Sequence, residues 1–361
     1  MRIRQLSIYN EFHCVGADCP ASCYKGWRVP VDEEAGRRFS VKNGLFGTLL
    51  RFSVIKKDGI TSFRSAGNRC PFWGPDRLCA IQKRCGTDYM PLVCVQFPRQ
   101  LSNFGFFCEE TLFLACPETA RLFLACVEEN RPFSFAEAQG EACCEVNTTN
   151  DDEAFLNNLL DAREELVRML REGLPYGSMS ILHYGHDAQN ACLSKSPLPE
   201  PVKYQNNTSE RFTPDCAVFN TLFFNGFYHP MLRTVSPFLH QLCKRYIREF
   251  GLPGRQNPSA ANRRLAAYKA HLYKLLPDLD RLLNRYYEYY LQTSFLNIFE
   301  DYSFSRHLLF GMAKTEMLWL FFALYAKNKK RLSTQELARI IAVYERRAPQ
   351  IEDALKLINQ S

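Results

Sequence analysis

Residues 14–27 read CVGADCPASCYKGW and place three cysteines within ten positions. Their spacing is C-x4-C-x3-C, and Gly16, Pro20 and Gly26 are turn-forming residues that can fold the thiols inward. Three explanations fit so dense a cluster: a disulfide framework, a metal site, or small hydrophobic residues in a core. The spacing differs from the C-x2-C pair of a zinc ribbon and from the cysteine run of a bacterial ferredoxin.

The remaining cysteines are concentrated in the same part of the chain. Of 15 cysteines, ten lie between residues 14 and 126, two lie at 143 and 144, and only Cys192, Cys216 and Cys243 follow. The opening residues, MRIRQLSIYNEFHC, contain no long apolar run, so the sequence predicts no export signal and a cytoplasmic protein. Because persistent disulfides are disfavoured in a reducing compartment, the clustered thiols indicate metal or redox chemistry. The three isolated cysteines are expected to be packing residues.

Size and charge narrow the class of protein. The chain has 361 residues, 46% of them hydrophobic and 23% charged, which is typical of a soluble protein with about two domains. The net charge of +7 is spread along the chain, so no nucleic-acid-binding surface is predicted. The most apolar run, MLWLFFALYA at 317–326, is half the length that a membrane span needs.

Two regions differ in their sequence pattern. Residues 1–148 contain strand- and turn-like text such as FSVIKKDGITSF, whereas residues 149–361 are dominated by helical periodicity. The sequence therefore predicts a mainly α protein. A cysteine-rich, metal-stapled N-terminal domain of mixed α/β structure (1–148) precedes a helical domain (149–361), with EACCEVNTTNDDE at 141–153 as linker.

Several helices can be placed from their apolar spacing and their caps. Asn150 or Asp151 is expected to cap a helix that ends at Gly173, and Ser259 one that Pro277 breaks. Further helices are expected near 303–327 and at 334–347, the latter capped by Ser333 or Thr334. Residues 174–216, rich in Pro, Gly, Ser and Asn, are predicted to form a long loop and a candidate lid.

The aromatic residues at 286–304, Arg99 and His13 can each be explained as structural residues or as parts of a functional site. Residues 286–304 hold eight aromatic residues, which fit a core helix, although tyrosine rings also attract sulfonium or ammonium groups. Arg99 can clamp a carboxylate through its planar guanidinium or form an ordinary ion pair. His13, next to Cys14, is expected to be a surface or hydrogen-bonded histidine rather than a metal ligand.

Four blocks of the N-terminal region resemble one known family. They read FHCVGADCPASCYKGW, RCPFWGPDRLCAIQ, LVCVQFPRQ and TLFLACPE, and they are similar to the N-terminal blocks of the flagellin lysine-N-methylases. That family is related to cysteine-rich domains that chelate zinc or iron. The segment 287–325 resembles the family's aromatic-rich C-terminal region more loosely. The resemblance implies a protein-lysine N-methyltransferase that uses S-adenosylmethionine, carries a 4Fe–4S cluster and acts on flagellin.

The resemblance also implies a set of metal ligands. The family's recurrent cysteines correspond to Cys14, Cys19, Cys23, Cys70, Cys79, Cys94 and Cys116. Tyr24 stands where the family typically has a second cysteine, and Cys85 stands where an apolar residue is usual, so Cys85 is expected to pack. Seven thiols exceed the four that one 4Fe–4S cluster uses, so some of them are structural or a second metal is bound.

The implied reaction sets a chemical requirement. A lysine ammonium has a pKa of about 10.4 and no lone pair, so it must lose a proton before it can be methylated. The sequence does not identify the base. Two alternatives remain open: a non-catalytic module that chelates or delivers iron or zinc, and a zinc-stapled adaptor that only binds a partner. Both leave the helical half of the chain without a role.

Overall fold

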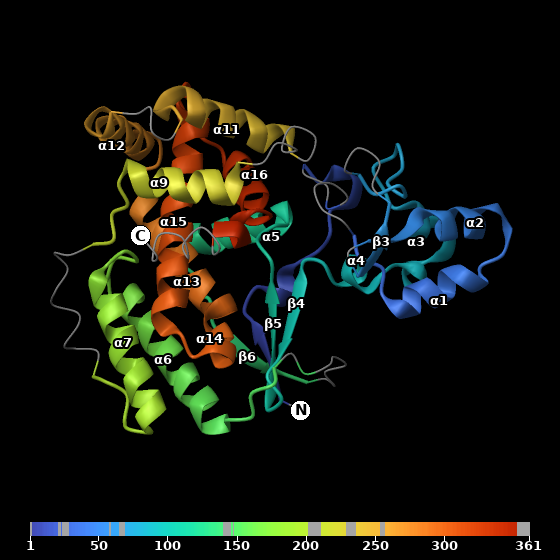
Figure 1. Ribbon diagram of the computed structural model, residues 1–361, viewed down its shortest axis with the longest axis horizontal. Helices are drawn as coiled ribbons and strands as arrows, with labels where there is room; N and C mark the ends of the chain where they lie inside the picture. Colours follow the sequence, from blue (N-terminus) through green and yellow to red (C-terminus); the bar gives the residue numbers. More distant parts are fainter. Residues whose placement is uncertain are drawn as a thin grey trace.

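The computed structural model describes residues 2–20, 23, 29–57, 59–64, 69–139, 146, 148–200, 211–228, 236–252 and 257–351. Most of these residues are helical, which confirms the mainly α prediction. They form a helical body, a small central sheet and a smaller cysteine-bearing unit on the far side of the sheet (Figure 1). The predicted linker at 141–153 lies largely outside the described residues, as do Cys143 and Cys144.

The central sheet has four strands in the order β4-β5-β1-β6. Strand β1 is parallel to β5 and antiparallel to β6, and β4 is antiparallel to β5. The strands are β1 (Arg2–Leu6), β4 (Arg99–Asn103), β5 (Phe107–Leu112) and β6 (Phe135–Ala138). The chain leaves the sheet after β1 and returns at β4, so the smaller unit is an insertion between two strands of one sheet.

The smaller unit has a hydrophobic core of its own. The stacked rings of Phe39 and Phe63, with Phe72 edge-on to Phe63, lie at its centre. Asp32 caps its first helix by accepting a hydrogen bond from the Ala35 amide at 2.9 Å, and it also accepts one from Leu92 at 2.7 Å. The elements of the unit are α1 (Glu33–Val41), α2 (Gly44–Ser53), β2 (Val54–Lys57), β3 (Ile60–Phe63), α3 (Ala80–Cys85) and α4 (Leu92–Gln96), with the 3-10 turn η3 (Thr87–Tyr89).

The helical body surrounds two long central helices, α13 and α15 (Figure 1). Its α-helices are α5 (Pro117–Glu128), α6 (Glu153–Arg171), α7 (Met179–Ser194), α9 (Cys216–Leu222), α11 (Pro237–Phe250), α12 (Pro258–Leu275), α13 (Leu279–Ser294), α14 (Ile298–Asp301), α15 (Phe304–Ala326) and α16 (Thr334–Glu345). Shorter turns are η1 (Tyr9–Glu11), η2 (Gly16–Asp18), the π-helix η4 (Phe223–Phe227), η5 (Phe295–Asn297) and η6 (Ala348–Gln350).

Helix α15 confirms the helix expected near 303–327, and the ten-residue apolar run at 317–326 forms its second half. Its 23 residues, with a mean hydropathy of 1.3 over the most apolar 18-residue window, meet the length and composition of a membrane span. However, 78% of its most apolar window is buried inside the protein. This burial is what the core helix of a folded domain shows.

The two hydrophobic cores do not follow the order of the chain. Residues from β1, β5 and α5 belong to the same core as the helices after residue 150. The second core is confined to residues 29–94. The division at residue 148 stays a prediction, and the packing groups the sheet with the helical body.

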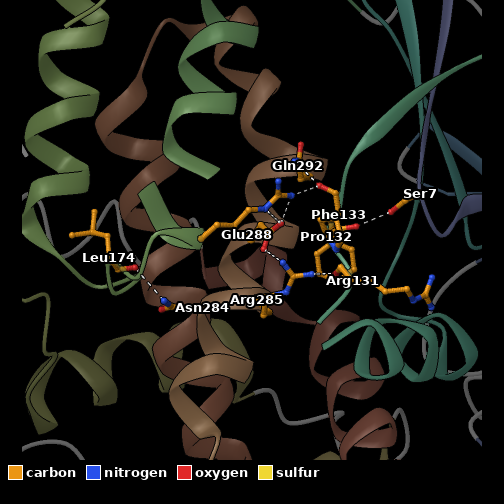
Figure 2. A network of polar contacts seen from close by, with 10 residues as sticks. Ser7, Arg131, Pro132, Phe133, Leu174, Asn284, Arg285, Glu288 and Gln292 are labelled. Atoms are coloured by element: carbon orange, nitrogen blue, oxygen red, sulfur yellow. Dashed lines mark hydrogen bonds and ion pairs between the residues drawn. The ribbon is translucent and has the colours of Figure 1, made fainter. Parts of the chain in front are cut away.

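Buried ion pairs join the sheet to the helices. Arg163 of α6, only 1% exposed, forms a bidentate pair with Glu109 of β5 at 2.7 and 2.8 Å. A second network surrounds Glu288 of α13, which pairs with Arg171 and Arg285 (Figure 2). Arg171 and Gln292 both donate to the Phe133 carbonyl, so the segment entering β6 is fixed against α6 and α13.

One predicted loop is in part a helix. Residues 179–194 of the predicted 174–216 loop form α7, which Ser178 caps by accepting from the Ser180 amide. The prediction was wrong here because the glycine and asparagine of this stretch lie within a helix. Gly185 instead lies where α7 approaches α15 so closely that a Cβ would lie 2.2 Å from Leu308 Cδ1. Residues 201–210 lie outside the described part of the chain.

Candidate functional site

The predicted metal ligands come from two parts of the fold. Cys14 and Cys19 flank the η2 turn, Cys23 follows, and Cys116 is the N-cap of α5. Cys70, Cys79 and Cys94 belong to the smaller unit, where they lie beside its core. The seven cysteines therefore form two groups, and thiols within each group influence one another's pKa.

The first group is centred on Cys23. Burial raises the pKa of the Cys23 thiol to about 12, and the neighbouring thiols Cys14, Cys19 and Cys116 add to this increase. Burial also raises the pKa of Cys116, but the amides of Glu118 and Thr119 in the first turn of α5 oppose that increase. Helix N-termini stabilise thiolates, so the first turn of α5 reduces the increase that burial causes in the pKa of Cys116.

The second group is centred on Cys94. Burial raises the pKa of its thiol, and Cys70, Cys79 and then Cys23 add to the increase. The Cys70 thiol has a pKa raised to about 11, again mainly by burial, with a smaller contribution from Cys79. Cys23 thus interacts with both groups and is the link between them.

The thiols are near one another without forming a ligand cage in this structure. Within the described parts of the chain, no group of three or more cysteine, histidine, aspartate or glutamate side chains is arranged to hold a metal ion. The metal-stapled character of the N-terminal region therefore stays a prediction. The donor chemistry is nevertheless of the right kind, because four interacting thiols are what an iron–sulfur cluster or a structural zinc requires.

A cavity of about 310 Å³ lies next to the first group of thiols. Cys23 lines it on one side, and Arg346, the C-cap of α16, lines it with Arg99 of β4. Phe97 and Phe113 contribute aromatic rings. The cavity forms where α4, the start of β4 and the end of α16 meet. We call it the thiol-side cavity.

Arg346 brings a positive charge to the thiols. Its Nε donates to the Ala115 carbonyl at 3.1 Å. Burial lowers the pKa of the guanidinium, and the nearby thiols Cys23, Cys19 and Cys116 oppose this decrease. Arg346 is thus placed to offset negative charge that develops on the first group of thiols.

Arg99, the candidate for binding a carboxylate, does line the thiol-side cavity. Its Nη2 donates to the Phe12 carbonyl at 3.3 Å. Its guanidinium also lies over two rings, at 5.5 Å from the Tyr9 centroid and 5.2 Å from that of Phe12. These contacts position the guanidinium beside the cavity.

Arg346 itself was missed by sequence reasoning. It follows α16 in YERRAP, a stretch that reads as an ordinary charged helix end. Its neighbours in the cavity lie about 230–320 positions earlier in the chain, and no local pattern could have brought them together. A charged residue just past a helix whose other residues are mostly buried was the available signal.

The other predicted residues lie elsewhere. His13 is exposed and bonds only to the Glu11 carbonyl among the contacts described, at 3.1 Å. Cys192, Cys216 and Cys243 are buried in the helical core, and Cys85 is partly buried in the smaller unit. Of the eight aromatic residues at 286–304, all except Tyr302 are buried, which confirms the core interpretation for them.

A larger cavity, of about 620 Å³, lies between α11 and the end of α15. Lys244, Arg248 and Lys329 line it, and none of the predicted site residues does. The thiol-side cavity is therefore the stronger candidate for a functional site.

Comparison with known proteins identifies relatives. The flagellar biosynthetic protein FliU of Salmonella muenchen is 30% identical over 128 residues, which are 33% of this chain and 76% of FliU. The lysine-N-methylases of Salmonella typhimurium and Salmonella choleraesuis are also 30% identical over 128 residues, but this match covers 32% of their length. No family model and no solved structure matches. The similarity to FliU extends over most of that protein, and this chain belongs to the flagellin lysine-N-methylase family.

Proposed function

We propose that this protein transfers a methyl group from S-adenosylmethionine to lysine side chains of flagellin, and that it does so in the cytoplasm. Two relatives bear the name lysine-N-methylase, and a third is a flagellar biosynthetic protein. The match spans only about a third of the two lysine-N-methylases, so the proposal also needs support from the site itself. One observation carries it: the thiol-side cavity combines two guanidinium groups, aromatic rings and a thiol.

The thiol-side cavity suits the methyl donor. S-adenosylmethionine carries a carboxylate at one end and a flat, aromatic adenine at the other. Arg99 and Arg346 can bind the carboxylate by charge-assisted hydrogen bonds, and Phe97 and Phe113 can pack on the adenine. The volume of about 310 Å³ is at the lower end of the range for small-molecule sites.

The first group of thiols is the proposed cluster site. Cys14, Cys19, Cys23 and Cys116 supply the four thiolates that one 4Fe–4S cluster uses, and Arg346 offsets part of their charge. Cys70, Cys79 and Cys94 would then be structural thiols or ligands of a second metal. When bound, a cluster held by these four thiolates would supply a centre that exchanges electrons.

The proposal is tested with the full-length protein purified anaerobically. We expect iron and sulfide in equal amounts, absorbance near ~400 nm as for iron–sulfur proteins, and binding of S-adenosylmethionine by calorimetry. Incubation with purified flagellin and the donor should yield methyl-lysine in peptides analysed by mass spectrometry.

The opposite result would identify the alternative function. A colourless protein that contains zinc, binds no donor and leaves flagellin unmodified would contradict the proposal. That outcome would support the metal-chelating module. A heat-denatured sample of the same protein controls for methylation that does not depend on the fold.

A further inference from the structure

A second cavity, of about 150 Å³, adjoins the thiol-side cavity. The two share Gln100 and Phe113 in their linings. Glu345 and Lys314 line the second cavity, together with the tyrosines of α13. Its exposed lining residues are Gln100 and Asn297, so a side chain from another protein can enter from that rim. We call it the tyrosine cavity.

Glu345 is the buried carboxylate of the tyrosine cavity. It is only 2% exposed. Its Oε2 lies 2.9 Å from Lys314 Nζ, and its Oε1 accepts a hydrogen bond from the Tyr286 hydroxyl. Burial, followed by the charge of Glu345, raises the pKa of Tyr286 well above its usual value of 10, so this hydroxyl stays protonated and donates. The carboxylate is thus held in a fixed orientation.

The cavity already holds one lysine ammonium. Lys314 Nζ lies 5.7 Å from the Tyr286 ring centroid and 5.6 Å from that of Tyr290. The hydroxyls of Tyr289 and Tyr290 donate to the carbonyls of Leu112 and His307, so their rings are fixed in place. Rings and a carboxylate around an ammonium are the groups that recognise a lysine side chain.

We propose that the tyrosine cavity receives the acceptor lysine and that Glu345 accepts its proton. The inference rests on the proposed methyl transfer, which it extends to the acceptor. Gln100 and Phe113 form a wall common to both cavities, and methyl transfer requires these two side chains to leave a passage between the amine and the donor. The site combines a carboxylate base, tyrosine rings and a second ammonium, all within one polar cavity.

The reaction balances with these groups. The acceptor ammonium transfers one proton to a carboxylate oxygen of Glu345, which leaves a neutral amine and a carboxylic acid. The amine nitrogen then forms a bond to the methyl carbon while the carbon–sulfur bond breaks. That electron pair stays on sulfur, which gives neutral S-adenosylhomocysteine and a methylated ammonium. Glu345 returns its proton to water at the rim.

Lys314 favours the reactive form of the acceptor. A positive charge near a second amine disfavours that amine's protonated state. An acceptor lysine beside Lys314 is therefore more readily deprotonated than one in water. The same ammonium holds the Glu345 carboxylate in place between substrates.

The test compares two buried glutamates. Glu345→Gln keeps the size of the side chain and its bond to Tyr286 but cannot take a proton. Glu316→Gln is the matched control, because Glu316 is 5% exposed and accepts a tyrosine hydroxyl bond from Tyr176 at 2.6 Å outside both cavities. Each full-length variant is assayed anaerobically with S-adenosylmethionine and flagellin, and donor binding is measured by calorimetry.

We expect Glu345→Gln to lower the methylation rate at pH 7.5 by about 100-fold or more, as the loss of a general base does. Donor affinity should stay within about threefold of the wild type, the change that a replacement outside the donor contacts gives. The rate of the variant should rise about tenfold per pH unit toward pH 10, since the fraction of neutral lysine rises by that factor. The Glu316→Gln protein should keep its activity.

Two further outcomes separate the proposals. Flagellin in which thialysine, a less basic analogue, replaces lysine should restore the rate of Glu345→Gln, whereas a purely structural defect would not respond. Equal activity of Glu345→Gln and wild type, or an equal loss at every pH, would overturn the role of Glu345 alone. A wild-type protein that methylates neither form of flagellin would instead overturn the proposed function.

Discussion

Glu345 and Arg346 are consecutive residues at the end of α16, and their side chains line two different cavities. Successive helical residues point about 100° apart, because a turn holds 3.6 residues. The last turn of α16 therefore contributes a carboxylate to the tyrosine cavity and a guanidinium to the thiol-side cavity. This single helix end positions both proposed reactants.

The first prediction concerns the charge of Arg346. Arg346→Met keeps much of the side-chain length but removes the guanidinium, so the donor loses a charge-assisted contact. We expect the affinity for S-adenosylmethionine to fall at least tenfold, or about 1.4 kcal/mol. Calorimetric titration measures this change. Arg121→Met, which removes an exposed arginine paired with Glu118 on α5, is the control and should bind the donor normally.

A second prediction concerns the two groups of thiols. Replacing Cys14, Cys19, Cys23 or Cys116 singly by serine should remove most of the bound iron. Double replacements within this group should lose little more, because ligands of one centre act together. Iron and sulfide analysis of each purified variant provides the measurement.

The remaining thiols supply the controls for that experiment. Cys192→Ala and Cys243→Ala should keep their iron, since these side chains are buried in the helical core. Cys85→Leu should keep it as well, since Cys85 is expected to be a packing residue. Cys94→Ser tests for a second metal. If the Cys23→Ser, Cys94→Ser double variant loses more metal than Cys23→Ser alone, the two groups of thiols bind separate metal centres. A Cys23→Ser protein that binds as much iron as the wild type would contradict the proposed cluster site.

The third prediction concerns the close packing of α13 on α15. A Cβ on Gly311 would lie 2.4 Å from ring carbons of Tyr290 and 2.7 Å from Tyr287. Gly311→Ala should therefore destabilise the protein by about 1–3 kcal/mol through overpacking, despite the better helix propensity of alanine. It should also lower methylation, because Tyr290 lines the tyrosine cavity. Urea unfolding and the flagellin assay measure the two effects.

Gly36 of α1 is the matched glycine for this comparison. A Cβ there would meet no atom within 4 Å. Gly36→Ala should stabilise the protein by about 0.5–1 kcal/mol, the usual gain in a helix. An equal gain from Gly311→Ala would show that the Tyr290 ring has room to move.

Local signals predicted much of the fold correctly. The apolar stripe that begins at Phe155 is buried along α6, although the cap is Asp152 rather than Asn150 or Asp151. Pro277 separates α12 from α13 as expected, while the cap of α12 is Asn257 rather than Ser259. Caps shift by one or two residues because several neighbouring polar side chains compete for the same amides.

The site required more than local signals. Periodicity cannot show that the chain leaves the sheet after β1 and returns at β4, an excursion that brings Cys23 beside Cys94. Arg99 could be proposed because a guanidinium next to an FPRQ turn suggests an anion site. Glu345 could not, because its partners Tyr286 and Lys314 belong to two other helices, α13 and α15. Arg346 could not, because its partner Ala115 lies 231 residues earlier in the sequence.

The last prediction links pH to the start of α16. Ser333 and Glu336 form a capping box, in which the Ser333 amide donates to Glu336 at 2.9 Å. Glu336 also pairs with Lys329 and accepts a bond from the Tyr325 hydroxyl at 2.8 Å. The pairing with Lys329 and the Ser333 amide lower the pKa of Glu336 from its usual 4.5 to about 2.

This decrease in the pKa of Glu336 determines how the stability of the folded protein depends on pH. The folded protein holds Glu336 ionised more readily than the unfolded chain does, so its contribution to stability is complete above pH 4.5 and is lost as the pH falls through about 2. Glu336→Gln should reduce the free energy of unfolding by up to about 1 kcal/mol at pH 7, because it removes a negative charge from the first turn of α16 while glutamine can still complete the capping box. Urea unfolding at pH 7 and pH 2.5 measures this difference, which should shrink at the lower pH. A difference of the same size at both pH values would show that the charge of Glu336 does not stabilise the helix that carries Glu345 and Arg346.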